Sequence, residues 1–405
     1  MEGHSRGVAA PPDSRPQFTT LTLGRRRFLV LLGAAAAYSS LQPRLGWAGK
    51  SSESAGAPSV WTLPDTLPAS AIEATRALIG AAILAPSYWN AQPWRFEVDA
   101  NELRLTLDPG RTLPFCDPDQ RFALLSLGAA LENLLVAARA WGLQPAVQYL
   151  PFGTHVRHGA SLVAARITWL PGDQPRDRVL FDALGSRRTN PRHYDGRTVT
   201  MQHRAQLLAQ VPEDLRVHWL DDLAEIRQIG RLVREATEAI ADDRDAQRER
   251  WGWIRLTDGA TRRTGDGVQP DRIGLDGPLG WLAARSLHPR SKVHGWAKGS
   301  WAHEAEDAVR SSGALALITA VRRQESTPIA AGQAYERFAL QATAFGLAQQ
   351  PLTAPIESEK HRALLSRRFG ATGEEPLLLV RLGHAKPPDP APRRAVALVS
   401  TWRNS

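Results

Sequence analysis

Cysteine is almost absent from this 405-residue chain, where Cys116 stands alone. A single thiol cannot form an intramolecular disulfide, and it excludes a metal site built from several cysteines. Cys116 lies between Phe115 and Asp117, without the adjacent histidine or cation that would activate a nucleophilic thiol. We therefore interpret Cys116 as a structural residue.

Several motifs of known chemistry are also missing. The chain has no G-x-G-x-x-G after a strand, no Walker loop and no H-E-x-x-H zinc motif. These absences argue against the common dinucleotide, nucleoside triphosphate and metalloprotease sites. We expect no metal centre.

Positive charge exceeds negative charge, but not in a pattern typical of nucleic-acid binding. Of the formal net charge of +9, residues 1–48 contribute +4, from six arginines and two acidic residues. The remaining excess is spread along the chain, and no basic stripe with interleaved aromatic residues occurs, so we expect no nucleic-acid partner. A cofactor that carries a phosphate would account for some of the clustered arginines.

Residues 1–48 have the features of a twin-arginine signal peptide. Arg25 and Arg26 precede Phe28 and Leu29, a short apolar run follows, and Gly46-Trp47-Ala48 offers a small-x-small cleavage site. The apolar run is shorter than the roughly 18 residues of a membrane span. We expect export by the twin-arginine translocation machinery to the periplasm or a similar extracytoplasmic compartment. A basic amphipathic arm is the less favoured alternative, and residues 49–68 resemble a linker.

A polar loop enclosed by Pro86 and Pro93 is the most informative stretch. Residues 85–96 read A-P-S-Y-W-N-A-Q-P-W-R-F, after a helical apolar run over 74–84 and before a strand-like run from 95. The prolines stiffen both ends of the loop. Ser87, Asn90 and Gln92 offer donors and acceptors that suit a planar ligand such as a flavin ring. The residues alone favour an ordinary helix-to-strand loop.

This stretch resembles the A-P-S-x-x-N-x-Q-P-W-R-F signature of the nitroreductase family of FMN enzymes, with every fixed position present. The resemblance implies that the loop lies against the isoalloxazine ring. It implies that Pro86, Ser87, Asn90 and Gln92 bind the cofactor FMN.

The body of the chain contains an internal repeat. Residues 128–143 align with 332–347 at a constant offset of 204, and seven of the sixteen positions are identical. The identities include both flanking glycines and the pair Glu132 and Glu336. Apolar residues recur at helical spacing in both segments, and each ends at a glycine, so we predict two related helices. Two unrelated alanine-rich helices are the alternative.

The predicted fold class is α+β, because helices and strands mix without βαβ regularity. We expect strands over 103–107, 163–170 and 377–382, and a buried strand over 314–321. The family resemblance implies two fused nitroreductase-like halves, over 69–178 and 179–405, that form an intramolecular pseudo-dimer. Ordinary nitroreductases are homodimers with FMN at the subunit interface, so this chain is expected to be a monomer.

The family's R-R-S-x-R-like phosphate motif is missing from the start of the first half. It is found instead at the start of the second half, where residues 186–192 read S-R-R-T-N-P-R. Arginine guanidinium groups bind phosphate through paired charged hydrogen bonds. We predict that Arg187, Arg188, Thr189 and Arg192 hold the FMN phosphate, with Arg192 replacing the basic residue that Pro191 displaces. A solvated basic turn is the alternative.

Loop and arginines together would make one composite site, and the opposite site would be empty or lost. Nitroreductases often place a C-terminal basic pair on the same phosphate, which implies a role for Arg393 and Arg394; a basic surface tail is the alternative. Residues 242–307 are rich in Trp and charge. They resemble the lid of the Acg-like branch of the family, known from mycobacteria, with a surface insertion as the alternative.

The predicted function is therefore an exported FMN-dependent oxidoreductase that reduces nitro or quinone acceptors by two electrons, with NAD(P)H as the family's donor. In this family the flavin carries the hydride and the protein positions it, so no protein acid or base is assigned a catalytic role. The alternatives are a flavoprotein that stores or sequesters FMN without turnover, and a degenerate scaffold without flavin.

Overall fold

The computed structural model describes residues 60–99, 102–153, 161–172 and 178–403. The predicted signal peptide and most of the predicted linker lie outside these ranges. The described helices and strands mix as an α+β fold, as predicted.

The first sheet has the strand order β3-β4-β2-β1-β9. Its strands are β1 (Trp94–Asp99), β2 (Glu102–Leu107), β3 (Leu143–Tyr149), β4 (Val163–Pro171) and β9 (Ser400–Trp402). All pairs are antiparallel except β1 with β9, which is parallel. The predicted strands over 103–107 and 163–170 are thus confirmed as β2 and β4. β3 was not predicted, because this edge strand is mostly exposed and carries no strong apolar pattern.

The second sheet is antiparallel, with the order β5-β6-β8-β7. Its strands are β5 (Leu215–Leu220), β6 (Ala314–Ala320), β7 (Ala348–Leu352) and β8 (Glu375–Gly383). Every residue of β6 is buried, and all but the first of β8, as expected for central strands covered on both faces. Both had been predicted from their apolar runs.

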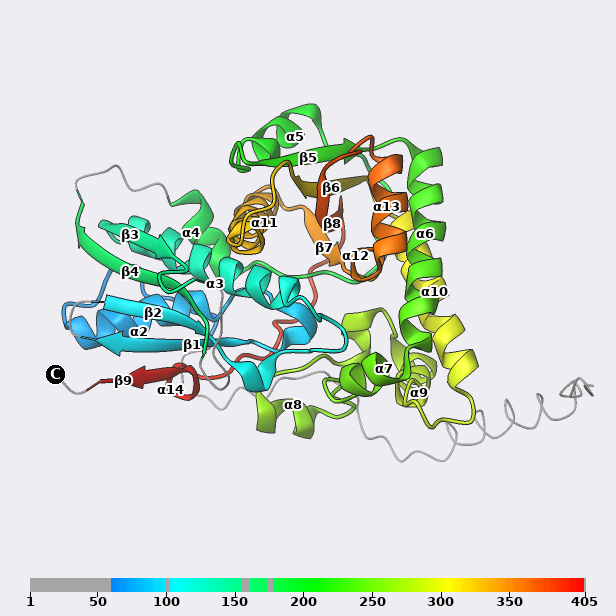
Figure 1. Cartoon of the computed structure of the whole chain (residues 1–405), viewed down its shortest axis with the longest axis horizontal. Coiled ribbons are helices and arrows are strands. Elements are labelled where there is room, and N and C mark those ends of the chain that lie inside the picture. Colours follow the sequence, from blue (N-terminus) through cyan, green and yellow to red (C-terminus); the bar gives the residue numbers. More distant parts are fainter. Residues whose placement is uncertain (1–59, 100–101, 154–160, 173–177, 404–405) are drawn as a thin grey trace, which may run out of the picture. The chain divides into compact units, whose positions relative to one another are not determined.

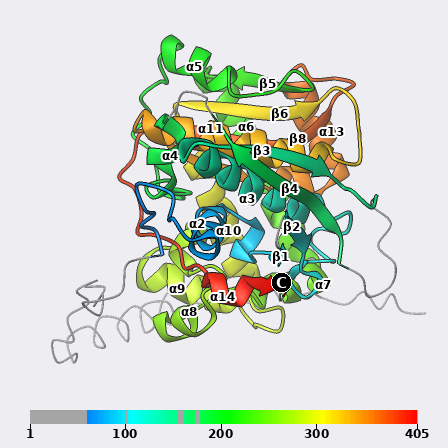
Figure 2. The ribbon, with the colours of Figure 1, turned by 90° about the vertical axis from the view of Figure 1, so that its left-hand side faces the viewer.

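Two long helices, α3 (Arg121–Ala140) and α11 (Thr327–Ala344), form the centre of the fold. Figures 1 and 2 show them side by side between the two sheets. Each is followed by a glycine with positive φ, Gly142 at 81° and Gly346 at 70°. These are the two related helices that the internal repeat predicts. α3 is apolar enough to pass as a membrane span, but 94% of that stretch is buried inside the protein.

Glycine allows the two helices to approach each other closely. A Cβ atom on Gly128 would overlap the carbonyl of Ile329, and one on Gly332 would overlap the carbonyl of Leu125. Leu125 and Ile329 are themselves separated by the repeat offset of 204 residues. The crossing is therefore approximately two-fold symmetric, as the interface of an internal pseudo-dimer should be.

The remaining helices surround this centre. They are α2 (Ala71–Ala82), α4 (Val179–Leu184), α5 (Met201–Leu208), α6 (Leu223–Asp242), α7 (Arg244–Trp251), α8 (Asp258–Thr264), α9 (Gly277–Ser286), α10 (His294–Arg310), α12 (Ala354–Glu357), α13 (Glu359–Arg368) and α14 (Val396–Val399). Short 3-10 turns are η1 (Tyr88–Asn90), η2 (Pro109–Arg111) and η3 (Pro270–Ile273).

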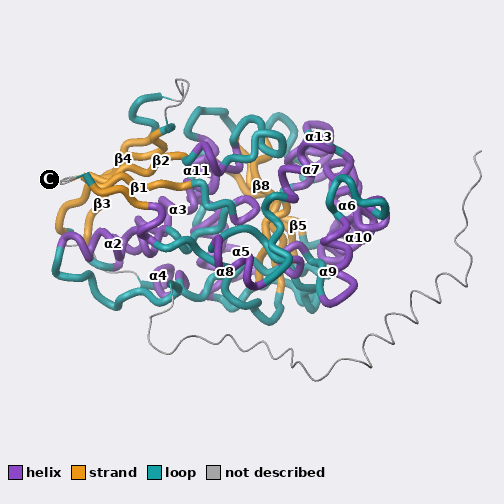
Figure 3. Tube along the Cα trace, turned by 90° about the horizontal axis from the view of Figure 1, so that it is seen from below, coloured by secondary structure: helices purple, strands orange, loops and turns teal. Residues whose placement is uncertain are grey.

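The predicted insertion, 242–307, contains α7, α8, η3, α9 and most of α10. It has its own small apolar core, and α10 packs along α6 (Figure 3). The chain ends in the first half, because β9 pairs with β1. No local sequence pattern predicts this return of the C-terminal segment.

Candidate functional site

The loop between α2 and β1 is held in an unusual backbone conformation. Trp89, Asn90 and Gln92 have φ values of 51°, 50° and 52°, a region that non-glycine residues rarely adopt. The Ser87 hydroxyl accepts a hydrogen bond from the Gln92 amide at 2.9 Å, and the Ser126 hydroxyl accepts one from the Tyr88 amide at 3.1 Å. Strain that is held by surrounding contacts in this way is common at binding sites.

Asn90 joins three parts of the chain. Its side-chain amide donates to the carbonyls of Gly267 at 3.0 Å and Pro392 at 3.2 Å, and its Oδ1 accepts from Arg393 Nη1 at 3.1 Å. Gln92 is fully buried beside it and donates to the carbonyl of Gly265 at 2.8 Å. These bonds fasten the loop to the insertion and to the C-terminal segment.

Arg187 is buried at the end of the short segment that follows α4. It is 2% exposed, and its Nε lies 3.1 Å from Glu336 Oε1 on α11. Thr189 forms a β-bridge with Gln349, which fixes the segment against the start of β7. The pattern left open a solvated basic turn, and the buried ion pair of Arg187 excludes that alternative.

The C-terminal segment brings Arg393 to the same place. Its Nη2 donates to the carbonyls of Leu84 at 2.9 Å and Ala85 at 3.0 Å, directly before the loop. The guanidinium groups of Arg393 and Arg188 both lie over the ring of Trp61, at 4.7 Å and 4.3 Å from its centroid. Trp61 therefore braces two arginines through cation–π contacts.

These elements enclose a cavity of about 270 Å³. Seven of the ten predicted residues line it: Pro86, Ser87, Asn90, Arg187, Arg188, Thr189 and Arg393. The structure thus brings the loop of the first half and the arginines of the second half together at one cavity.

The other three predicted residues do not line the cavity. Gln92 lies behind the loop, where its Oε1 accepts from the backbone amide of Arg394 at 2.9 Å. The Arg394 side chain bonds the backbone of Gln92 and Leu398. Arg192 is exposed, with its Nη1 3.4 Å from the carbonyl of Lys386, and it is Pro191 that lines the cavity in its place. A direct contact with a ligand is therefore not supported for these three side chains.

The basic side of the cavity carries more positive charge than its acidic partners balance. Burial and the neighbouring Arg187 lower the pKa of Arg188 to about 10, and the same two causes hold the pKa of Arg393 well below its ordinary value. The buried Nε of Arg393 has no hydrogen-bond partner in the part of the chain that the structure describes. Because a guanidinium keeps its charge, this side of the cavity fits an anion such as a phosphate.

Aromatic and apolar side chains form much of the remaining lining of the cavity. Tyr88 stacks on Phe122 with centroids 4.7 Å apart, and Trp89 meets Trp301 of α10 edge to face at 6.3 Å. The insertion contributes Gly267, Val268, Arg272, Ile273 and Gly274 to the lining. A flat aromatic group with a phosphate arm matches this combination of apolar surface and arginines.

Sequence reasoning missed Trp61, Arg272 and Glu336 as residues of this site. Trp61 precedes the first helix in a segment interpreted as linker, and nothing in the local pattern indicates it. Glu336 had been noticed as one of the identities in the repeat, which was the available signal. Its role depends on Arg187, 149 residues earlier in the chain, so sequence alone could not pair them.

Comparison with known proteins gives the following similarities. No protein-family model matches the chain. It is 28% identical over 344 residues to the putative NAD(P)H nitroreductase Rv3131 of Mycobacterium tuberculosis, covering 82% of this chain and 92% of that protein. It is 26% identical over 352 residues to the putative NAD(P)H nitroreductase acg of the same organism, covering 82% and 96%.

Solved structures with a partly similar arrangement include nitroreductases. The FMN-dependent nitroreductase NfnB of Mycobacterium smegmatis in complex with NADPH matches 56% of this chain and 95% of its own, at 15% identity and a TM-score of 0.33. A putative nitroreductase from Anabaena variabilis matches 70% and 69%, at 11% identity and a TM-score of 0.40. Over four-fifths of its length the chain is thus similar in sequence to putative NAD(P)H nitroreductases.

Proposed function

We propose that this protein is an exported FMN-dependent oxidoreductase that reduces nitro or quinone acceptors by two electrons. The observation that carries the proposal is the joining of the strained loop and the buried arginines at one cavity with unbalanced positive charge. The similarity to two putative NAD(P)H nitroreductases supports the reaction class. In a single chain with an internal pseudo-dimer, we expect one such site and a monomer.

In this proposal Arg187, Arg188 and Arg393 hold the FMN phosphate, and Thr189 adds a hydroxyl donor. Arg187 and Arg393 are anchored by Glu336 and by backbone carbonyls, so their positions do not depend on the ligand. This preorganisation lowers the entropic cost of binding. Arg272 adds positive charge from the insertion.

The loop would orient the ring. Ser87 Oγ accepts from the Gln92 amide, and among the described residues no acceptor takes its hydroxyl proton, so that proton is available to a ring acceptor. Asn90 is held by three partners and shapes the edge of the site. When bound, FMN supplies the hydride chemistry, and the chain's residues bind it, orient it and exclude water from it.

The export part of the proposal rests on the twin-arginine pattern alone. The twin-arginine route carries folded proteins, so the cofactor would be loaded in the cytoplasm. Nicotinamide cofactors are scarce outside the cytoplasm, which makes the physiological electron donor a separate question from the reaction class.

One observation favours the alternative of an FMN-sequestering protein. The insertion lies across the site and is fastened to the loop by Asn90 and Gln92 through the carbonyls of Gly267 and Gly265. A cover held by buried hydrogen bonds would slow the exchange of substrates. Steady NAD(P)H oxidation with a nitroaromatic acceptor would exclude sequestration, whereas a flavin reduced only by strong chemical reductants would support it.

The direct test is the visible absorption spectrum of protein purified from the cytoplasm. We expect flavin absorption bands whose intensity corresponds to about one FMN per chain. Arg188→Ala should weaken FMN binding by roughly 10- to 100-fold, the effect of one charged hydrogen-bonding group, and leave riboflavin binding unchanged. Arg197→Ala, at an exposed arginine paired with Asp195, is the matched control. A colourless protein that takes up no added FMN would overturn the proposal.

A further inference from the structure

The outward face of α9 is apolar, although it lies on the surface. Leu279 is 72% exposed, Leu282 45% and Trp281 37%. On the opposite side of the same helix, Ala283 and Ala284 are buried in the small core of the insertion. A face with this many large apolar side chains is unusual for a surface that contacts only water.

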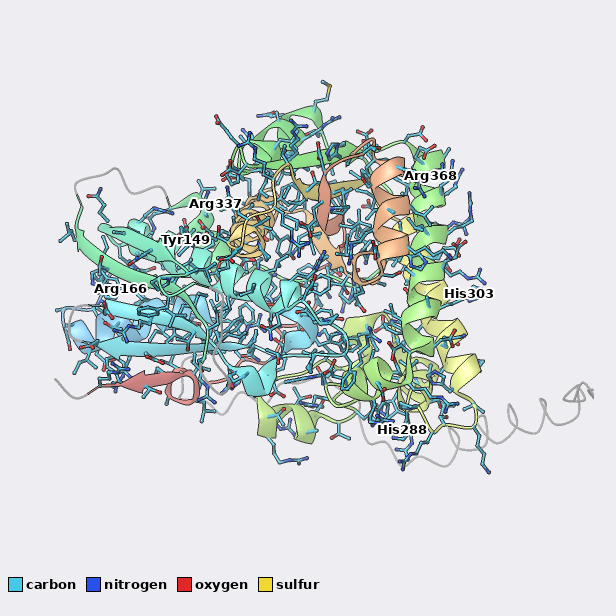
Figure 4. The ribbon with its side chains drawn as sticks, viewed as in Figure 1. Tyr149, Arg166, His288, His303, Arg337 and Arg368 are labelled. Carbon is cyan, nitrogen blue, oxygen red and sulfur yellow. The ribbon has the colours of Figure 1, made fainter. Side chains whose placement is uncertain are left out.

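The start of α10 also carries exposed apolar side chains. Val293 is 51% exposed and Trp296 is 47% exposed, while Ala297 and Trp301 on the inner side are buried. α9 and α10 pack against each other, and His288 marks the turn between them in Figure 4. We call residues 277–298 the α9–α10 hairpin.

The charge of this hairpin is of one sign. Residues 277–303 contain Arg285, Arg290, Lys292 and Lys298 and no acidic residue. The whole insertion, 242–307, has eleven basic and eleven acidic residues, so its positive charge is concentrated here. Arg285, Arg290 and Lys292 are exposed, whereas Lys298 is paired with Asp242 at 2.8 Å.

Exposed Trp and Leu beside Arg and Lys, with no acidic residue within 277–303, is the composition of a surface that binds at a lipid–water interface. Tryptophan favours the headgroup level of a bilayer, and basic side chains are attracted to anionic headgroups. A protein partner would more often be met by a polar rim of both signs. We propose that the α9–α10 hairpin docks this protein on an anionic phospholipid bilayer.

The docking surface and the cavity share α10. Trp301 and Glu304 of this helix line the cavity, and Val293 and Trp296 near its start are exposed. The inference is independent of the proposed function, since lipid binding requires neither FMN nor turnover. If both hold, lipid-dissolved acceptors would reach the site over a short distance.

Sedimentation with large unilamellar vesicles tests the proposal. The full chain should bind vesicles of phosphatidylcholine with one-third phosphatidylglycerol, and bind pure phosphatidylcholine vesicles much less. Because the apolar N-terminal run can itself bind lipid, every variant should also carry Leu31→Gln and Leu32→Gln. The charge reversal Arg290→Glu with Lys292→Glu should lower the partition coefficient by on the order of tenfold or more. High salt should weaken wild-type binding as well.

The apolar part of the face is tested separately. Trp281→Ala with Trp296→Ala should lower partitioning by on the order of tenfold at any salt concentration. The matched controls are Arg322→Glu with Arg323→Glu, and Met201→Ala, at exposed positions far from the hairpin in sequence. Equal binding to both vesicle types, or equal losses in the controls, would overturn the proposal. Concentration-dependent self-association that the hairpin variants abolish would also overturn it, in favour of an interface between proteins.

Discussion

Glu132 on α3 and Glu336 on α11 occupy equivalent positions of the repeat, yet they have different partners. Both are fully buried. Glu132 accepts from Arg337 Nε at 2.6 Å and from Gln333 at 3.0 Å. Glu336 is paired instead with Arg187, which comes from outside both helices.

The repeat explains where the difference arises. Arg337, the partner of Glu132, is equivalent to Asn133 under the same offset of 204 residues. With its amide oriented to satisfy both neighbours, Asn133 donates to Glu336 at 3.0 Å and accepts from the Ala85 amide at 3.1 Å. The same contact therefore occurs twice, but beside the candidate site the arginine is an asparagine. The missing cation is supplied by Arg187.

The two environments differ in access to water. Arg337 is 30% exposed and lies next to Tyr149 on the outer side of the helix pair (Figure 4). Arg187 is 2% exposed and lies at the cavity. One copy of the two-fold contact is thus a partly exposed ion pair, and the other is a buried ion pair at the candidate site.

The largest expected effect is a pH dependence that belongs to Glu336. Burial raises the pKa of Glu336 from 4.5 to about 7, although Arg187 and Arg393 oppose the rise. The folded protein then keeps a proton that the unfolded chain has released. Stability of the flavin-free protein should fall by about 3 kcal/mol as pH rises from about 4.5 to about 7. Urea unfolding at a series of pH values measures this.

Two isosteric variants separate Glu336 from other groups. Burial also raises the pKa of Asp117 to about 7, so part of the pH dependence has the same sign for another reason. Glu336→Gln should remove the part of the pH dependence that Glu336 causes, so stability should change less with pH. Glu132→Gln should leave most of that part in place, because the charge of Glu132 is the smallest of the causes that act on the pKa of Glu336. Parallel curves for wild type and Glu336→Gln would show that Glu336 is ionised throughout and that the pairing with Arg187 outweighs burial.

The second effect tests the symmetry of the helix crossing. Gly128→Ala and Gly332→Ala each place a methyl group against a carbonyl of the other helix, Ile329 and Leu125 respectively. Each should lower the free energy of unfolding by about 1–3 kcal/mol, as overpacking does, and the two losses should be similar.

Gly80→Ala in α2 is the matched control, because no atom lies within 4 Å of a Cβ at that position. There the better helix propensity of alanine should stabilise the protein, by up to about 1 kcal/mol. A large loss at only one of the two crossing glycines would mean that the crossing is not symmetric in energy.

Much of the architecture could be predicted from local pattern. The apolar runs of β6 and β8 have the length of buried strands, and the repeat around Glu132 and Glu336 indicated two related central helices. β3 could not be predicted, because an exposed edge strand needs little apolar pattern. Nor could β9, since it depends on a pairing with β1 between residues 304 positions apart, Phe96 and Ser400.

The candidate site was predictable where one segment carries the signal. The loop around Ser87 and Asn90 and the arginines at 187–188 are contiguous motifs, and the structure places both at the cavity. Arg192 was assigned from its spacing, yet it points away because Thr189 is bridged to Gln349 and the chain then turns. Which side of a short segment faces a cavity is decided by such long-range contacts.

The smallest expected effect concerns Trp61, which has no counterpart in the Glu132 environment. Trp61→Leu removes the ring on which Arg188 and Arg393 lie, and a cation–π contact contributes about 0.5–2 kcal/mol. FMN should therefore bind roughly 2- to 30-fold more weakly, as measured by quenching of flavin fluorescence. Riboflavin should bind as before, because the arginines act on the phosphate. The control is Trp402→Leu, because Trp402 of β9 makes a similar cation–π contact with Arg76 of α2. Equal losses for FMN and riboflavin would mean that Trp61 acts on the ring or on folding, and that the two arginines keep their positions without it.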